Sequence, residues 1–520
     1  MKKIQYILFF AAVGLFANSC ADSYLNQEPG GSSITENQYM NMDDAVEGTV
    51  KGIYPLFYLN GDDHDSFGQR AIDMYGDLLC GDMALKTQNY GWFATDELMQ
   101  TNTRRGYLWS FYYGIIRSCN KAINAVDAQG QPQLIFDIDT LSEEDYRNGF
   151  FYAEALTLRG WAYSKLANFF VPVGKNIASN AIPIYTEVDT KADTIIGSPL
   201  STVADLYKRI EDDLLSGIQY FEAYNAETRT SKIEVNADVA RILLAYAYLN
   251  KGDYANALKS AQEAIEKGQS HILPNKEVLT TGFNNVENEN WVWGQNVTVE
   301  NTTALASFFG QCDIYSYSYA SAGDVKGIDQ KLYASIEEWD IRKKWWNNYA
   351  VKDSTYKYAP DGKFYSAKSK TLQGDRDWLS DNVYMRWELA YLIAAEAACR
   401  MSDVTTAQNY LFAITDQRQL EGKTTEYETW KAGLSDPTVL LAAIKHNWRI
   451  ELWGEGYGLQ TFRRYDEAVN LGDNHLRNER TITPSTARTF TFEIPSSEEY
   501  YNPFLRTTNN DDTRSLRKKI

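Results

Sequence analysis

Apolar residues recur at helical spacing in two consecutive runs between Asn236 and Gly268. The runs are separated by Lys251-Gly252-Asp253, where glycine suits the end of one helix and aspartate caps the start of the next. The second run carries small residues that let two helix backbones approach closely, namely Ala257, Ala261 and Ala264. The pattern therefore predicts a helical hairpin.

This hairpin resembles a tetratricopeptide (TPR) repeat, which uses a similar Gly-Asp-Tyr turn and spaced alanines. The stretch from Glu388 to Ile414 follows the same pattern, because Ala407, Leu411 and Ile414 repeat the offsets of the three alanines. Further amphipathic helices are predicted over residues 106–126, 150–170 and 203–221. One such hairpin leaves a face uncovered, so the sequence predicts a mainly α-helical stack.

The stretch between the two hairpins, residues 273–382, has a different character. It is rich in Asn, Ser, Tyr, Trp and Gly and has weak periodicity. One alternating run, Trp291-Val292-Trp293, is typical of a strand, and we expect both tryptophans in the core. Because loops can vary while a scaffold holds them, we expect the function to lie in this loop-rich, partly irregular region.

The N-terminus has the features of a leader peptide. Lys2 and Lys3 precede an apolar run from Ile7 to Ala17, which is too short to span a bilayer. The run ends before Cys20 in a pattern similar to a bacterial lipobox. We predict a signal peptide over residues 1–19, acylation of Cys20 and a tether over residues 20–40. An ordinary secretory leader with an incidental cysteine is the alternative.

The remaining cysteines are far apart and form no C-x-x-C pair: Cys80, Cys119, Cys312 and Cys399. A disulfide is compatible with an exported protein, but we favour buried free thiols. The formal net charge of −18 argues against a nucleic-acid partner, which requires a basic surface.

Sequence motifs for hydrolysis, zinc binding and phosphate binding are absent from the chain. Gly454–Gly458 is only superficially similar to a dinucleotide loop, because Leu459 occupies the third glycine position. The acidic turn at Gly61–Asp65 lacks the spacing of a calcium loop. We expect no catalytic residue, no metal and no cofactor. A carboxylate pair for glycoside hydrolysis stays open, since the fold sets its separation.

Several stretches carry a family resemblance. They are Cys20 with Leu25 and Pro29, the helix Ala153–Val173, the hairpin Asn236–Gly268, the set Arg386, Glu388, Leu392, Ala395, Glu396 and Ala397, the set Arg449, Glu451, Leu452, Glu455, Gly456 and Arg464, and the closing run Phe492–Pro503. Together they resemble the SusD-like (RagB/SusD) family of outer-membrane lipoproteins.

The resemblance implies about four TPR-like hairpins within a single domain over residues 41–520, with the loop-rich insertion at about 273–382. It also implies a surface-exposed, outer-membrane lipoprotein that captures glycans without altering them and passes them to a SusC-like TonB-dependent transporter. Capture of peptides on the same fold, a surface glycoside hydrolase and a purely protein-binding adaptor remain alternatives. We interpret Arg449 and Glu451 as a scaffold ion pair.

The motifs that carry the resemblance contain no ligand-binding residues, so we select candidate ligand-binding residues by their chemical properties. Sugar rings stack on aromatic planes, while nearby polar groups bind the hydroxyls. Two loop stretches offer this mixture, one with Tyr90, Trp92 and Phe93, the other with Tyr315, Tyr317 and Tyr319. We predict that the two loops meet as a stacking platform, with the three tyrosines on one side of an extended segment. The alternative is that these tyrosines line a strand packed on the core.

Overall fold

The predicted hairpin forms two helices, α10 (Ala237–Lys251) and α11 (Tyr254–Lys267). Asn236 caps α10 by accepting hydrogen bonds from two backbone N–H groups of its first turn. Gly252 ends α10 with φ +86°, and the Asp253 side chain accepts from the N–H of Asn256. The second hairpin, α14 (Trp387–Arg400) and α15 (Val404–Thr415), is capped in the same way by Asp403. Both hairpin predictions are confirmed.

The structure is a computed structural model that describes residues 45–58, 63–98, 104–129, 132, 134, 142–171, 177–186, 197–224, 231–347, 353–366, 370–376, 378–478, 480–484 and 490–505. The signal peptide, the tether and the acylation predicted at Cys20 lie outside these residues.

The other helices are α4 (Ala45–Lys51), α5 (Gln69–Cys80), α6 (Ala94–Glu97), α7 (Arg105–Gln129), α8 (Glu143–Phe170), α9 (Val203–Ala223), α12 (Phe308–Cys312), α13 (Gln330–Ala334), α16 (Thr424–Ala432), α17 (Pro437–Glu451), α18 (Gly458–Tyr465) and α19 (Ser496–Tyr501). The strands form antiparallel pairs: β1 (Met83–Leu85) with β5 (Lys326–Ile328), β2 (Asn180–Pro183) with β3 (Leu200–Thr202), β4 (Trp291–Gln295) with β6 (Asn382–Arg386), and β7 (Val469–Asn470) with β8 (Thr481–Ile482).

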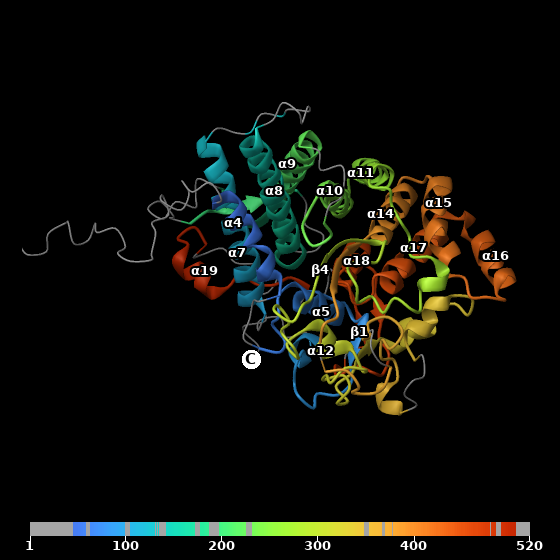
Figure 1. Ribbon diagram of the computed structural model, residues 1–520. Coiled ribbons are helices and arrows are strands. Elements are labelled where there is room, and N and C mark those ends of the chain that lie inside the picture. The colour runs from blue at the N-terminus through green and yellow to red at the C-terminus, as the bar shows by residue number, and fades with distance from the viewer. Residues whose placement is uncertain are drawn as a thin grey trace, which may run out of the picture.

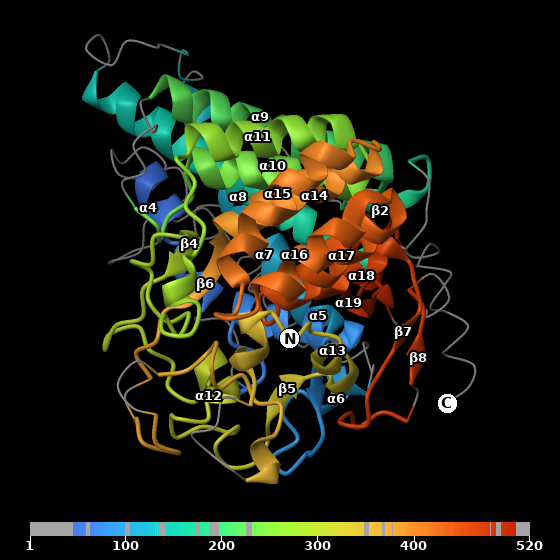
Figure 2. The same ribbon diagram turned by 90° about the vertical axis from the view of Figure 1, so that its right-hand side faces the viewer.

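The long helices form a continuous stack in which consecutive members pack side by side. The order runs from α7 through α8, α9, α10, α11 and α14 to α15 and α17. Figure 1 shows this stack as an arc, and Figure 2 shows the same helices as one layer above the loop-rich part of the chain. Ala257, Ala261 and Ala264 and their counterparts Ala407, Leu411 and Ile414 are all fully buried. The mainly α-helical, TPR-like scaffold is therefore confirmed.

The loop-rich part lies against α5 (Figure 2) and β1, which are both far from it in the sequence. The pairing of β1 with β5 joins the two segments, with Met83 opposite Ile328. Within this part, β4 pairs with β6, and both Trp291 and Trp293 are buried, as predicted. The four cysteines that the structure describes are buried free thiols, also as predicted.

A buried cluster of charges joins the scaffold to the loop-rich part. Four cations and four carboxylates, all nearly inaccessible to solvent, make up this ion cluster: Arg342, Lys363, Arg386, Arg418, Asp340, Glu388, Glu451 and Glu455. Glu451 lies at its centre, 2.9 Å from Arg342, 3.1 Å from Arg386 and 2.9 Å from Arg418.

The predicted pairing of Arg449 with Glu451 is wrong, although both residues belong to the scaffold. Arg449 binds Asp82 at 2.6 Å. Two residues separated by one position on a helix point in different directions, so they meet different partners.

Candidate functional site

Two loops that are far apart in the sequence meet, as predicted. Tyr90 and Trp92 lie in the loop before α6, and their rings contact the ring of Tyr319, which follows α12, at centroid distances of 5.0 and 6.2 Å. The ring of His64 contacts both Trp92 and Tyr319 at 5.4 and 5.5 Å. We name these four residues the aromatic platform. Tyr90 is 53% exposed and the other three are half-buried, so the platform faces solvent.

The fully buried carboxylate of Asp324 holds the two loops together. It accepts hydrogen bonds from the backbone N–H of Asn89 at 3.0 Å and from that of Tyr90 at 3.4 Å. The backbone N–H of Asp324 in turn donates to the carbonyl of Tyr319 at 2.9 Å. One residue therefore positions aromatic rings from both loops before any ligand arrives, which reduces the entropy lost on binding.

A second network positions His64. Gln311 on α12 donates to the backbone carbonyl of His64 at 2.7 Å, and the ammonium of Lys326 donates to the side-chain carbonyl of Gln311 at 2.8 Å. The Tyr319 hydroxyl lies 3.1 Å from Nδ1 of His64. Burial lowers the pKa of Lys326 to about 8, while the nearby Asp324 opposes this change.

The segment with the three tyrosines is not extended, so the prediction that they share one side is wrong. The buried carboxylate of Asp313 folds it into a turn by accepting from the backbone N–H of Tyr315 and the hydroxyl of Ser316. Burial raises the pKa of Asp313 to about 6. Tyr315 is consequently buried in a small separate core, whereas Tyr317 is 40% exposed.

Phe93 is also fully buried and offers no ring face to solvent. Its backbone has φ +64°, and its ring packs against Phe67 and Tyr75 at 6.0 and 5.6 Å. This residue anchors the loop, so the residues whose rings remain accessible in the two stretches are Tyr90, Trp92, Tyr317 and Tyr319.

Three residues beside these rings were not predicted from the sequence. His64 belongs to the acidic turn Gly61–Asp65, whose composition suggested only a calcium site. Arg376 places its guanidinium 4.3 Å from the ring centre of Tyr317, and Trp378 donates its indole N–H to the Tyr317 carbonyl at 3.0 Å. Arg376 and Trp378 lie in the loop-rich stretch. Their Arg-Asp-Trp sequence combines a cation with an aromatic ring, and this combination could have indicated a ligand-binding position.

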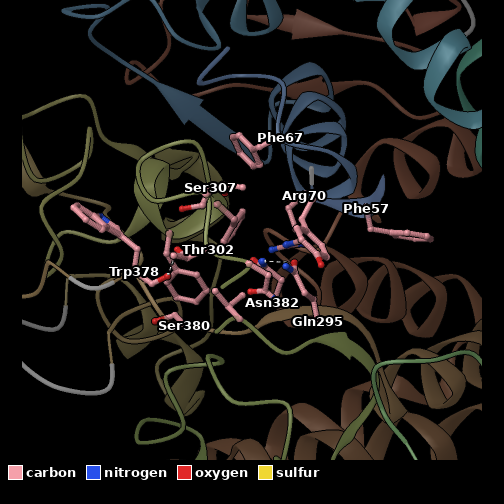
Figure 3. Close-up of a pocket in the computed structure, with 15 residues that line it drawn as sticks. Phe57, Phe67, Arg70, Gln295, Thr302, Ser307, Trp378, Ser380 and Asn382 are labelled. Atoms are coloured by element: carbon pink, nitrogen blue, oxygen red, sulfur yellow. Dashed lines mark hydrogen bonds between the residues drawn. The ribbon is translucent and has the colours of Figure 1, made fainter. Parts of the chain in front are cut away.

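A narrow cleft lies next to Trp378 (Figure 3). It has room for about one water molecule, with a volume of about 20 Å³. Its lining comes from α5, β4, β6 and the loop before α12, and includes Arg70, Gln295, Thr302 and Asn382. The cleft is too small for a sugar ring.

A larger cleft, of about 600 Å³, lies between α7 and α19. Trp109, Tyr113, Tyr185 and Tyr501 supply aromatic groups there, and Arg117 supplies a cation. This region was not predicted as a site, because its residues belong to a regular helix and to a short closing helix without a loop-like composition.

Replacement of Asp324 by asparagine tests the positioning network. The variant loses the charge that holds the backbone of the platform loop, so we expect the free energy of unfolding to fall by about 1.5–3 kcal/mol. Urea denaturation followed by tryptophan fluorescence measures this change. Asp473→Asn is the control, because that side chain is 92% exposed and its replacement is expected to change stability by less than about 0.5 kcal/mol. Equal stability of the two variants would contradict the role assigned to Asp324.

Solved structures share this fold. A SusD-like carbohydrate binding protein from Bacteroides vulgatus superposes with a TM-score of 0.71 at 21% identity, over 89% of this chain and 97% of that chain. A SusD superfamily protein from the same species superposes with a TM-score of 0.72 at 19% identity, over 90% and 99% of the two chains.

Sequence comparison finds similar proteins. A curated SusD-like protein of Bacteroides ovatus is 24% identical over 289 residues, which is 54% of this chain and 48% of the relative. The match thus spans about half the length of that relative. Residues 23–244 match the profile of a SusD-like family described as "Starch-binding associating with outer membrane". The chain is thus similar to SusD-like proteins in sequence over residues 23–244 and in fold over most of its length.

The SusD-like sequence motifs are structural in this chain. Arg386, Glu388, Glu451 and Glu455 lie in the ion cluster, and Arg464 binds Glu396 at 2.7 Å. The residues that match these motifs therefore belong to the scaffold and not to the aromatic platform. Along the described residues, no helix combines the length and apolar character that a bilayer span requires.

Proposed function

We propose that this SusD-like protein is a cell-surface lipoprotein that captures oligosaccharides or polysaccharides without cleaving them. The observation that carries the proposal is the aromatic platform, in which rings from two distant loops meet at the surface and are fixed by buried polar groups. The family description, starch binding in association with the outer membrane, supports a glycan as the ligand class.

The platform has the chemistry that a sugar requires. The exposed faces of Tyr90 and Trp92 offer flat apolar surfaces on which the C–H groups of a pyranose ring stack. The exposed side chain of Asn89 and the imidazole of His64 lie beside them and supply donors and acceptors for hydroxyls. Tyr317 and Arg376 extend the same chemistry along the loop.

Delivery to a transporter completes the proposal. The resemblance to the family implies a SusC-like TonB-dependent barrel as the partner and a lipid on Cys20 as the anchor. An acylated N-terminus followed by the polar tether would let the binding domain stay at the outer membrane without a spanning helix. Globomycin treatment of expressing cells and mass spectrometry of the mature N-terminus would test the anchor.

We expect weaker glycan binding when an exposed ring of either loop is removed. Alanine in place of Trp92 and of Tyr317 should each weaken affinity about 10-fold, because loss of a stacked aromatic ring costs about 1–2 kcal/mol. Electrophoresis in gels that contain soluble starch, pullulan, xylan or pectin measures this as reduced retardation.

Tyr501→Ala is the matched control, because this tyrosine is 78% exposed but lies on α19, next to the larger cleft. The polysaccharide gels should retard the Tyr501→Ala protein as strongly as the wild-type protein. Loss with Tyr501→Ala and none with the Trp92 and Tyr317 variants would move the site to the cleft between α7 and α19. Retention of peptides from a casein digest, or release of products from a labelled polysaccharide, would favour the peptide or hydrolase alternatives.

A further inference from the structure

Two side chains that line the narrow cleft beside Trp378 each carry a buried polar atom with no hydrogen-bond partner in the described structure. The two atoms are Nε of Arg70, on α5, and Oδ1 of Asn382, at the start of β6. Figure 3 shows both side chains, with Gln295, among the residues that line the cleft. An unpaired buried polar group of this kind costs about 1–3 kcal/mol, so such atoms usually mark a missing partner.

The rest of each side chain is already committed. Nη1 of Arg70 donates to Asp73 at 3.0 Å, and Nη2 donates to the carbonyl of Gly454 at 2.7 Å. The guanidinium also lies 3.9 Å from the ring centre of Phe308. Nδ2 of Asn382 donates to the side-chain oxygen of Gln295 at 2.9 Å. Both side chains are thus held in place by other contacts, and Nε of Arg70 and Oδ1 of Asn382 are the atoms left without a partner.

These two atoms require opposite partners. Nε–H of Arg70 can only donate, and Oδ1 of Asn382 can only accept. A hydroxyl group satisfies both at once, because its oxygen accepts and its hydrogen donates. A carboxylate could pair only with Arg70, and an ammonium only with Asn382. The volume of about 20 Å³ admits one such group and excludes a ring.

The half-buried residues that line the cleft are mostly polar and include Asn301, Thr302, Thr303, Trp378 and Ser380. Trp378 connects the cleft to the ligand surface, because its indole N–H donates to the carbonyl of Tyr317 and its own carbonyl accepts from Thr302 at 3.0 Å. A ligand that extends along the loop past Tyr317 therefore reaches the mouth of the cleft.

We propose that the cleft is a specificity pocket for one hydroxyl or hydroxymethyl group of a neutral sugar, recognised jointly by Arg70 Nε and Asn382 Oδ1. The inference rests on the proposed glycan binding. A water molecule has the same donor and acceptor chemistry and occupies the pocket in the free protein. The sugar hydroxyl replaces this water, and sugars that present a carboxylate or a deoxy carbon at that position are disfavoured.

Two variants distinguish the loss of the Asn382 oxygen from the loss of its hydrogen bond to Gln295. Asn382→Leu and Gln295→Leu both remove the hydrogen bond between these side chains, but only Asn382→Leu removes Oδ1. With whichever soluble polysaccharide retards the wild-type protein, we expect Asn382→Leu to weaken affinity about 10-fold and Gln295→Leu to change it less than about 3-fold. Equal effects of the two variants would overturn the proposal.

Crystals of the wild-type protein, alone and soaked with an oligosaccharide cut from that polysaccharide, give a test that does not depend on variant folding. An oxygen bonded to both atoms in the free protein, replaced by a sugar oxygen in the complex, is the expected result. A water that stays in place while sugar binds elsewhere, or an empty pocket, would overturn the inference and leave glycan binding intact. A wild-type protein that retains no polysaccharide would instead refute the proposed function.

Discussion

Replacement of Glu451 by glutamine is expected to lower the free energy of unfolding by about 3–5 kcal/mol. Glu451 is fully buried and contacts three arginines of the ion cluster. Burial alone would raise its pKa, but Arg418, Arg386 and Arg342 together hold the pKa of this carboxyl well below its ordinary value. The carboxylate is therefore charged in the folded protein at all ordinary pH values.

The balance of charge explains the size of the effect. The ion cluster contains four cations and four carboxylates, so the folded protein buries no net charge there. Glutamine keeps the shape but leaves one buried positive charge without a counterion. Removal of one partner from a buried ion pair is far more costly than the pair itself is stabilising.

Chemical denaturation at pH 7 measures this loss as a lower midpoint. Glu428→Gln is the control, because Glu428 forms an exposed ion pair with Lys431 at 3.0 Å. Exposed pairs of this kind contribute less than about 1 kcal/mol. If the Glu451 variant loses no more stability than the control, the cluster does not join the scaffold to the loop-rich part in the way described.

Asparagine at position 77 is expected to flatten the pH dependence of stability. Asp77 on α5 is buried and accepts from the backbone N–H groups of Gly456 and Gly458. Burial, together with the neighbouring carboxylates of Asp82 and Asp73, raises its pKa to about 8.

The direction of the effect follows from the protons bound in each state. Between pH 4 and pH 8 the folded protein keeps a proton on Asp77 that the unfolded chain releases, so rising pH favours unfolding in this window. The stability that Asp77 contributes is fully present below the ordinary pKa of aspartate and is lost as the pH rises through about 8. A tenfold difference in proton affinity between the two states corresponds to about 1.4 kcal/mol. The contribution of Asp77 to the free energy of unfolding can therefore fall by up to about 4 kcal/mol between pH 5 and pH 8.

Thermal and urea denaturation at pH 5 and pH 8 measure the difference. We expect Asp77→Asn to equal or exceed the wild-type protein in stability at pH 8 and to fall below it at pH 5, because asparagine offers one acceptor oxygen where the protonated acid has two. Asp212→Asn, on the exposed face of α9, is the control and should follow the wild-type curve. Parallel curves for all three proteins would show that Asp77 is not the group responsible.

The amino-acid sequence alone determined the local elements of this protein. Helical periodicity and capping residues act over a few positions, so Asn236, Gly252 and Asp253 define one hairpin wherever it lies in the fold. The alternation of Trp291 and Trp293 likewise identified a buried strand. The two aromatic loops were recognisable because their composition differs from that of the helices.

Only the tertiary structure decided which side chains in those loops face solvent. Trp92 and Phe93 are neighbours with similar chemistry, yet a positive φ at Phe93 turns its ring into the core. A turn built on Asp313 buries Tyr315 and exposes Tyr317. Both outcomes also depend on other segments, because Asp313 accepts from the backbone N–H of Ser366 and the ring of Phe93 packs against Phe67 and Tyr75.

The same reason applies to the partners of charged residues. Arg449 and Glu451 lie two positions apart, but one binds Asp82 and the other the central arginines. The hairpins, their caps and the buried tryptophans follow from forces that act between near neighbours in the chain. Long-range packing alone brings Asp324 to the loop of the platform. It also brings together Arg70 and Asn382, which line one cleft.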